Sequence, residues 1–379
     1  MHSLTITESA SGPRTIKPPA LAIIGLVATA TAAAGAATDA LNAAFPLGEL
    51  TLVTNIDAAI AAAGSGGTLA PALAAIRDQV TPIVVVARVA PGEGEDAQED
   101  TDANVIAGLD LLLTAKTSVG VAPRIIGAPG LDTLAVTTEM IVVAKRLRAM
   151  AYAAAIGDDI AEVTAYRNGF TARELMLIWP DTSIDFAGDA VARALGLRAQ
   201  IDERIGWHKT LSNVPIDGVI GTTVAVQFDL LDPSTEAGTL NGAEVTTIIR
   251  ENGFRFWGNR TTAGPDHPEF AFESAVRTSH ALQDIIAQTF QPFMDHPMTV
   301  GMIKDLLETV NAAFRNLAVQ GRIMGAKAFF DADANTADQL AAGRPNFRIQ
   351  YTPVAPLEDP TVRLVITDFY YSGFADQLV

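Results

Sequence analysis

The sequence predicts two domains of different class: an α/β domain with a largely parallel sheet, then a smaller α+β domain built on a β-hairpin. The first prediction rests on short apolar runs that alternate with helical patterns from Ala20 to Ile205. The second rests on two long helical patterns that precede the strand-like runs Arg322–Phe330 and Phe347–Val354. A strand-like arm is also predicted at each end of the chain, because alternating apolar residues there are separated from the rest by prolines.

In the α/β domain, each predicted strand is a short run rich in apolar residues, and each helix is a longer segment with apolar residues three or four apart. The strands are at Ala20–Val27, Glu49–Val53, Ile83–Val89, Pro123–Ala128, Tyr152–Ile156 and Glu174–Trp179. The helices are at Asn55–Ala63, Thr68–Val80, Asn104–Ala115, Leu131–Met150, Asp158–Asn168 and Asp189–Ile205. Between the third strand and the third helix, the acidic segment Pro91–Asp102 is predicted to be a solvated loop.

The N-terminal region also resembles a secretion signal. Arg14 and Lys17 precede an apolar run, and Ala32–Ala37 offers small residues for cleavage. The segment before the run is long and already contains a strand-like pattern, so we favour a buried first strand at Ala20–Val27. No other apolar stretch approaches the ~20 residues of a membrane span, and we expect a soluble chain.

The second domain is predicted to begin with Asn241–Arg260, two strand-like pieces around the turn pair Asn252–Gly253. Phe270–Phe293 follows as a long helix, and Thr299–Val319 is the most clearly amphipathic helix of the chain. We therefore divide the chain into an N-terminal arm (1–21), an α/β domain (22–243), an α+β domain (244–356) and a C-terminal arm (357–379).

The two arms have the pattern of strands without an assigned partner. Such a strand has two options: it folds back on the hairpin of its own chain, or it pairs with the open sheet edge of a neighbour. Strand exchange between subunits is the hypothesis to test. The candidate arm residues are Leu4, Ile6, Val362, Leu364 and Ile366, and the candidate acceptor residues on the hairpin are Ile323, Phe329, Ile349 and Tyr351.

Composition argues against several classes of function. The net charge of −17 repels phosphate backbones, so nucleic acid is not an expected partner. The absence of cysteine excludes disulfides and thiolate metal sites. The five histidines are not spaced as metal ligands, and neither HExxH nor GxSxG occurs. We predict no catalytic residue, no metal and no cofactor.

Two glycine-rich segments raise the alternative of a nucleotide-dependent α/β enzyme. Gly64–Thr68 lacks a lysine and follows a helix. Gly127–Gly130 follows a strand and opens a helix, where anions bind, but Asp132 would repel a phosphate. We interpret this second segment as a tight turn. Retained nucleotide after purification would favour the enzyme, whereas an N-terminus processed near Ala32 would favour a third alternative, a secreted binding protein.

Aromatic residues near the domain boundary have the composition of a stacking platform for a sugar or a nucleic acid. Because Phe254 and Phe256 alternate with Arg255, a packed core strand explains them better. Arg255 and Arg260, beside these aromatics, are candidates for buried or interface ion pairs.

Specific stretches resemble the tail sheath proteins of contractile-tailed bacteriophages and the related R-type tailocins. They span nearly the whole chain in order, and the tryptophan-centred ones are the most specific. The stretches are AIIGLV at Ala22, LVTN at Leu52, PRIIGAPGLD at Pro123, ELMLIWPD at Glu174, ARALGLRAQID at Ala192, GWHKTLSNV at Gly206, TTIIRENGFRFWGNRT at Thr246 and YTPVAPLED at Tyr351.

The resemblance implies a structural protein rather than an enzyme. Members of this family form hexameric rings stacked helically around a rigid tube, and they contract to drive the tube through a target cell envelope. The resemblance assigns 22–243 to an outer domain and 244–356 to an inner domain near the tube, with both arms donated to neighbours. The implied partners are other copies of the chain, the tail tube protein, and the baseplate and tail terminator proteins.

The implied location is the tail of a virion or tailocin particle, assembled in the bacterial host cytoplasm without direct membrane insertion. For the tube contact, we expect the polar side of the Thr299–Val319 helix, with Lys304, Arg315 and the nearby Arg322 as candidate residues.

Overall fold

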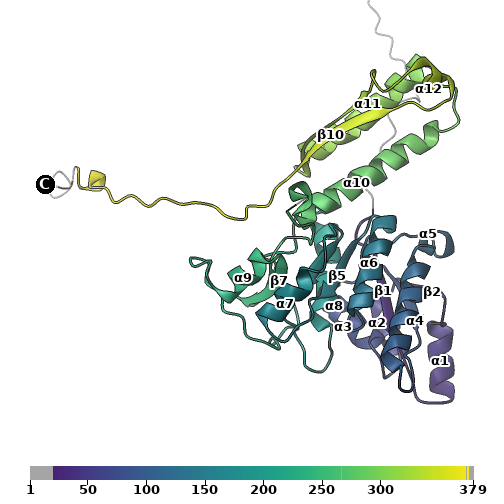
Figure 1. Cartoon of the computed structure of the whole chain (residues 1–379), viewed down its shortest axis with the longest axis vertical. Coiled ribbons are helices and arrows are strands. Elements are labelled where there is room, and N and C mark those ends of the chain that lie inside the picture. The colour runs from purple at the N-terminus through teal and green to yellow at the C-terminus, as the bar shows by residue number, and fades with distance from the viewer. Residues whose placement is uncertain (1–19, 266, 373, 375–379) are drawn as a thin grey trace, which may run out of the picture.

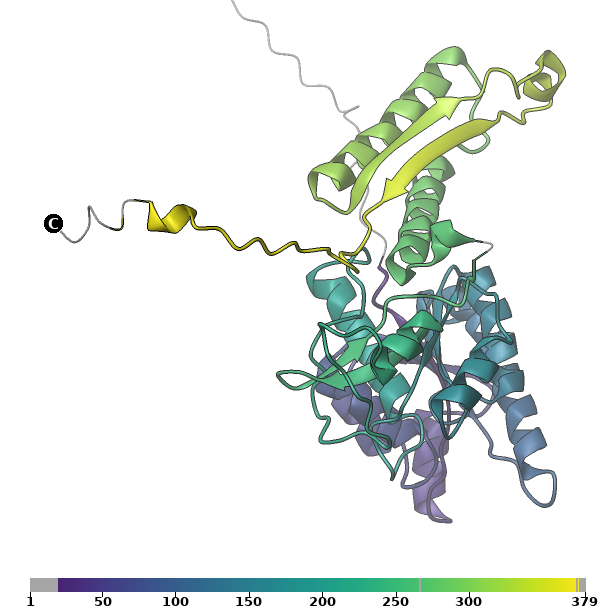
Figure 2. The ribbon, with the colours of Figure 1, turned by 60° about the vertical axis from the view of Figure 1, so that its left-hand side comes forward.

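The computed structural model describes residues 20–265, 267–372 and 374. Two bodies and an extended C-terminal segment make up this part of the chain (Figures 1 and 2). The larger body contains an eight-stranded sheet with helices on both faces, and the smaller body contains two long helices and a two-stranded sheet. Within the described ranges, no helix is long and apolar enough to cross a membrane.

The large sheet has the strand order β2-β3-β1-β4-β5-β6-β7-β8. Its six central strands are parallel, whereas the edge strands β2 and β8 are antiparallel to their neighbours. A largely parallel α/β sheet is therefore confirmed. The strands are β1 (Ile24–Thr29), β2 (Leu50–Val53), β3 (Val84–Val89), β4 (Ile125–Gly127), β5 (Met150–Ala154), β6 (Leu175–Ile178), β7 (Val245–Arg250) and β8 (Phe254–Trp257).

The central strands are continuously apolar because both faces of the sheet are covered. Every residue of β1 and β3 is buried, which agrees with our interpretation of Ala20–Val27 as a buried strand. Helices α1 (Ala36–Ala44), α2 (Ile56–Ala62), α3 (Leu69–Gln79) and α8 (Asp189–Arg204) pack on one face. Helices α4 (Ala97–Leu112), α6 (Leu134–Leu147), α7 (Ile160–Arg167) and α9 (Glu236–Gly242) pack on the other, and the short α5 (Ala115–Ser118) follows α4.

The smaller body is formed by α10 (Glu273–Phe290), α11 (Val300–Val319) and the antiparallel pair β9 (Ile323–Phe330) and β10 (Phe347–Pro353). The predicted apolar stripe of α11 faces its core, where Val310 and Phe314 are fully buried. The Thr299 side chain caps this helix by accepting a hydrogen bond from the Met302 amide at 3.2 Å. Short elements complete the chain: α12 (Ala337–Ala341) and the 3₁₀ turns η1 (Pro268–Phe270), η2 (Gln291–Phe293) and η3 (Phe369–Tyr371).

The hairpin within Asn241–Arg260 differs from its prediction in position but not in form. Asn252 and Gly253 have positive φ angles, as a tight hairpin turn requires. The hairpin does not open the smaller body, however, because β7 pairs with β6 and extends the large sheet. A turn signal is local and carries no information on which sheet the hairpin joins. The large sheet therefore continues beyond residue 243, where we had ended the α/β domain.

Two segments to which the sequence pattern assigned no helix are partly helical. Only the first half of the acidic segment Pro91–Asp102 is a loop, because α4 begins at Ala97 rather than at the predicted Asn104. Glu99 and Asp100 occupy the first turn of α4, where negative charge interacts favourably with the helix dipole. The alanine-rich region after β1 ends in helix α1, in agreement with the high helix propensity of alanine.

Candidate interaction site

The C-terminal arm, described here over 357–372 and 374, extends away from both bodies (Figures 1 and 2). Each of its described residues is exposed. The predicted strand residues Val362, Leu364 and Ile366 are 78%, 92% and 103% exposed. No strand is assigned within the described part of the arm, because none of its backbone groups meets a sheet edge of the same chain. The arm therefore does not take the first of its two options, pairing with its own hairpin.

The exposed arm carries an unusual amount of apolar surface for a segment without a partner. Burying one such side chain stabilises a structure by about 1.5–3 kcal/mol. A segment with many exposed apolar side chains is therefore typical of an interaction site that becomes buried in an assembly. Near its end, η3 brings aromatic rings together, with the centroids of Phe369 and Tyr370 5.5 Å apart. The exposed apolar residues of the arm are Leu357, Val362, Leu364, Val365, Ile366, Phe369, Tyr370, Tyr371 and Phe374.

The β9–β10 hairpin is the predicted acceptor, and among the described residues it forms a sheet of two strands only. No further strand pairs with either outer edge among the described residues, but the Asn311 side chain of α11 already hydrogen-bonds the N–H and C=O of Ala328 in β9. The outer edge of β10 is therefore the open one in the described chain. Ile323, Ile349 and Tyr351 pack on the core of the smaller body beneath this sheet. Phe329 is not part of this core, and the Lys327 ammonium lies 4.8 Å from the centre of its ring. Three of the four acceptor candidates thus stabilise the hairpin from its core side, and the outer edge of β10 remains for backbone pairing.

The three candidate residues for a tube contact do not form one cluster. Lys304 is exposed on α11. Arg315 is exposed too, but it binds Glu308 of the same helix at 2.5 Å. Arg322 is half-buried, and its guanidinium lies 4.9 Å from the ring centre of Trp207, at the end of α8. Arg322 thus contributes to packing between the two bodies.

A buried ionic network joins α8 of the larger body to α10 of the smaller one, and it was not predicted from the sequence. Arg198 binds Asp202 at 2.9 Å and Glu273 at 3.1 Å, and Arg277 also binds Asp202. The Tyr152 hydroxyl donates a hydrogen bond to Glu273 at 2.5 Å. All four charged side chains are at most 2% exposed. Each of the two helices contributes one positive and one negative side chain, and every one of these charges has a partner. Such a network fixes how the two bodies meet.

Glu273 is charged within this network. Burial raises the pKa of its carboxyl, but the neighbouring guanidinium groups of Arg198 and Arg277 outweigh burial and hold the pKa below its ordinary value. A second contact supports the junction: Asp284 of α10 binds Arg124 at 2.7 Å and Arg148 at 2.9 Å. The sequence signal for the first contact is the presence of charged residues within the otherwise apolar helix α8.

The glycine-containing turn Gly127–Gly130 and the adjacent Asp132 have structural roles. Gly130 adopts the positive φ of a tight turn, as predicted for Gly127–Gly130. Asp132 just beyond is buried, and its carboxylate accepts a hydrogen bond from the Ala154 amide at 2.6 Å. Among the described residues, no group of three or more potential ligand side chains could hold a metal ion.

Two family models match consecutive parts of the chain. One, described as phage tail sheath protein central domain, matches residues 104–262, and the other, phage tail sheath C-terminal domain, matches residues 266–367. The chain belongs to the phage tail sheath protein family. The two matches meet between β8 and α10, where the large sheet ends and the smaller body begins.

Relatives of this sheath family member match over nearly its full length. It is 43% identical to the tail sheath protein of Escherichia phage P2, over 98% of this chain and 97% of the relative. It is 40% identical to the major tail sheath protein of Serratia phage KSP20, over 98% and 96%. Its fold is similar to the helical sheath of the anti-feeding prophage in the contracted state, with a TM-score of 0.69, 16% identity and coverage of 97% and 98%.

Proposed function

We propose that this sheath family member is a structural subunit that polymerises as stacked hexameric rings around a tail tube. In this proposal the polymer contracts and drives the tube through the envelope of a target cell. The observation that carries the proposal is the C-terminal arm: its apolar residues are exposed, and it points away from a chain whose hairpin has an open edge at β10.

We propose that Val362, Leu364 and Ile366 add a strand to the hairpin of a neighbouring subunit. A strand given to a neighbour that does not return it is a heterologous contact, which propagates into rings or helices. Each main-chain hydrogen bond contributes about 0.5–1.5 kcal/mol net, so one short pairing gives only a few kcal/mol. The N-terminal arm residues Leu4 and Ile6 lie outside the described residues, and we propose the same role for them. Two tethered arms for each subunit make the assembly multivalent.

Such arms allow subunits to stay connected while their bodies move. The direction of contraction must then come from a difference in free energy between two lattices, and repacking of the larger bodies is our candidate for its source. We propose that the larger body, 22–262, forms the outer part of the sheath. The smaller body, from Pro268 to 356, forms the inner part. This division is placed where the large sheet ends, after β8, and not at residue 243, where the sequence-based division ended the α/β domain.

For the tube contact, we keep the exposed side of α11 with Lys304 and Arg315 as the proposed surface, and Arg322 as a residue that supports it from the junction. Reversing Lys304 and Arg315 to Glu is expected to give a sheath that polymerises without a tube. Normal assembly of sheath on tube by this double variant would exclude the surface.

The remaining parts of the proposal concern partners and location. We propose that the polymer ends contact baseplate and tail terminator proteins, and that the particle is a virion tail or tailocin assembled in the host cytoplasm. We propose no enzymatic role, cofactor, nucleic-acid partner or direct membrane insertion. In support, both relatives compared above are tail sheath proteins over at least 96% of their own length.

Electron microscopy of the purified chain tests strand exchange. Wild-type protein is expected to form tubular polymers, and the Val362→Ser/Leu364→Ser/Ile366→Ser variant is expected to stay unassembled with an unchanged fold. The matched control, Arg363→Ser/Thr367→Ser, changes the alternate positions of the same segment and is expected to polymerise. Tubes formed by the triple variant at the wild-type protein concentration would refute the role of these side chains.

A further inference from the structure

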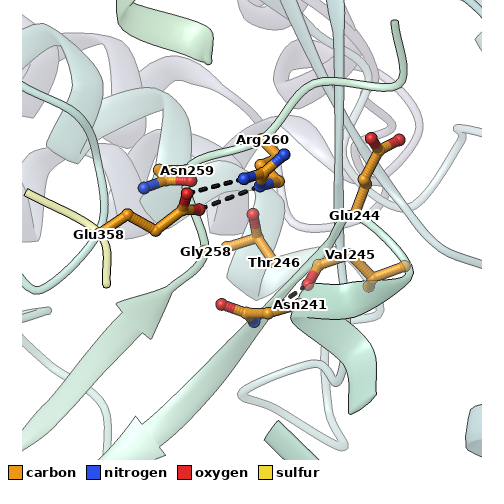
Figure 3. A pocket seen from close by; sticks show the side chains of 8 residues that line it. All are labelled: Asn241, Glu244, Val245, Thr246, Gly258, Asn259, Arg260 and Glu358. Atoms are coloured by element: carbon orange, nitrogen blue, oxygen red, sulfur yellow. Dashed lines mark hydrogen bonds and ion pairs between the residues drawn. The ribbon is translucent and has the colours of Figure 1, made fainter. Parts of the chain in front are cut away.

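The C-terminal arm is held at a second point after it leaves the hairpin. Glu358 accepts two hydrogen bonds from Arg260, from Nε to Oε1 at 3.0 Å and from Nη2 to Oε2 at 2.7 Å (Figure 3). Two parallel bonds between a guanidinium and a carboxylate form a bidentate pair, which fixes the orientation of both groups. The two side chains are 36% and 35% exposed, so the pair lies at the surface.

Arg260 is well placed to serve as the fixed half of this pair. Its backbone is bridged to Phe272, just before α10, and its guanidinium lies 5.2 Å from the centre of the Phe272 ring. The guanidinium is in a small recess at the end of the large sheet (Figure 3). Besides Arg260 and Glu358, the recess is lined by Asn241, Glu244, Val245, Thr246, Gly258 and Asn259.

The segment between the hairpin and this pair is a strap attached at both ends. It begins at Pro353, the last residue of β10, and it ends at Glu358. Five residues of chain span at most roughly 17 Å, and Pro356 within the strap restricts its backbone further. Beyond Glu358 the described arm makes no hydrogen bond or ion pair to either body. Free movement of the arm therefore begins after the pair rather than at the hairpin.

We propose that Arg260 and Glu358 are positioning residues that set the direction in which the arm leaves the subunit, relative to the large sheet. This inference rests on the proposed donation of the arm to a neighbour. A strand that is presented in a narrow range of directions reaches its acceptor at a higher effective concentration than a freely rotating one. The pair also couples the arm to the larger body, so a rotation of that body against the hairpin either redirects the arm or breaks the pair.

Distance measurements on the unassembled subunit test the pair directly, and the absence of native cysteine makes site-specific labelling simple. Nitroxide labels are attached at Asp110→Cys, exposed on α4, and Thr361→Cys, the third residue beyond Glu358. The labelled protein is measured at a dilution at which electron microscopy finds no polymer. Pulsed electron spin resonance is expected to give a narrow distance distribution, which Arg260→Ala and Glu358→Ala each broaden at least two-fold.

Three comparisons separate positioning from general stability. Asp359→Ala removes the adjacent carboxylate, which makes no ion pair in the described chain, and should leave the distribution narrow. The double variant Arg260→Ala/Glu358→Ala should be no broader than either single variant, because the two residues act as one pair. The melting temperature should stay unchanged throughout, as expected for a surface pair.

A wild-type distribution as broad as that of Glu358→Ala would overturn the inference, and so would equal broadening by Asp359→Ala. This result is independent of strand exchange. If the proposed donation of the arm is wrong, the pair still narrows the distribution but its loss leaves polymerisation unaffected. If the arm is donated and the pair positions it, Glu358→Ala with an otherwise wild-type arm should polymerise several-fold more slowly than Asp359→Ala.

Discussion

The buried network between the two bodies predicts a large loss of stability from a change of a single side-chain atom. Glu273→Gln keeps the size of the side chain but removes its charge. Arg198 and Arg277 then face only Asp202, which leaves one positive charge without compensation at a site that is at most 2% exposed. Removing one partner from a buried ion pair costs about 3–5 kcal/mol, and we expect the free energy of unfolding to fall by that amount.

Urea unfolding of the unassembled triple-serine variant measures this loss without a contribution from polymerisation. Trp207 is buried near the junction and reports on it by fluorescence. With a slope of about 3 kcal/mol per M, the midpoint should fall by about 1–2 M. Glu269→Gln is the matched control, because Glu269 is 59% exposed and should change stability by less than about 0.5 kcal/mol. A loss below about 1 kcal/mol for Glu273→Gln would show that the network does not hold the two bodies together.

The same substitution has a predicted pH dependence. Because the folded-state pKa of Glu273 is below its ordinary value of 4.5, the unfolded chain binds the proton more tightly than the folded chain. The carboxylate therefore contributes its full stability above pH 4.5, and this contribution is lost as the pH falls through the folded-state pKa. The difference in stability between wild type and Glu273→Gln should accordingly decrease below pH 4.5.

Two further predictions concern the smaller body and α10. The Asn311 side chain of α11 donates one hydrogen bond to the Ala328 backbone of β9 at 3.1 Å and accepts one from it at 2.8 Å. Asn311→Ala should therefore lower the free energy of unfolding by about 1–3 kcal/mol and speed amide hydrogen exchange in β9. An unchanged rate of hydrogen exchange in β9 would contradict this prediction. Burial, together with the positive charge of Arg277 and neighbouring arginines, lowers the pKa of His280 from 6.5 to about 3. As the pH falls, the unfolded chain therefore binds the proton before the folded chain does. Between pH 7 and pH 4, the free energy of unfolding measured in urea should fall by up to about 3 kcal/mol more for wild type than for His280→Gln. Equal losses in the two proteins would contradict this prediction.

Local patterns predicted most of the elements correctly. The stripe that contains Val310 and Phe314 defined α11, and Asn252–Gly253 defined a hairpin turn, because both signals depend on residues close in sequence. The assignment of that hairpin to the smaller body was wrong, since the partner strand β6 ends more than sixty residues earlier in the chain. Strand pairing at such a separation leaves no signal within a single short window.

The contacts that join the bodies could not be predicted for a similar reason. Arg260 was a candidate for an ion pair, but its partner Glu358 is 98 residues away. Arg198 and Glu273 are 75 residues apart, and no residue near either one in the sequence identifies the other as its partner. For the arm, alternation at Val362, Leu364 and Ile366 indicated a strand, and the described chain forms none there. A pattern specifies that a segment is able to pair, but it does not specify the chain with which it pairs.

Cross-linking between two differently labelled subunits tests the central claim, that the C-terminal arm pairs with the hairpin of another chain. One preparation carries a single cysteine at one of the positions Thr361–Thr367 in turn, and the other carries Gln350→Cys or Lys327→Cys on the hairpin. After the preparations are mixed and polymerised, oxidation should give covalent dimers between the two kinds of subunit, with a maximum at alternate arm positions. Cross-links that form instead within one chain carrying both cysteines, at a dilution where no polymer exists, would contradict the claim.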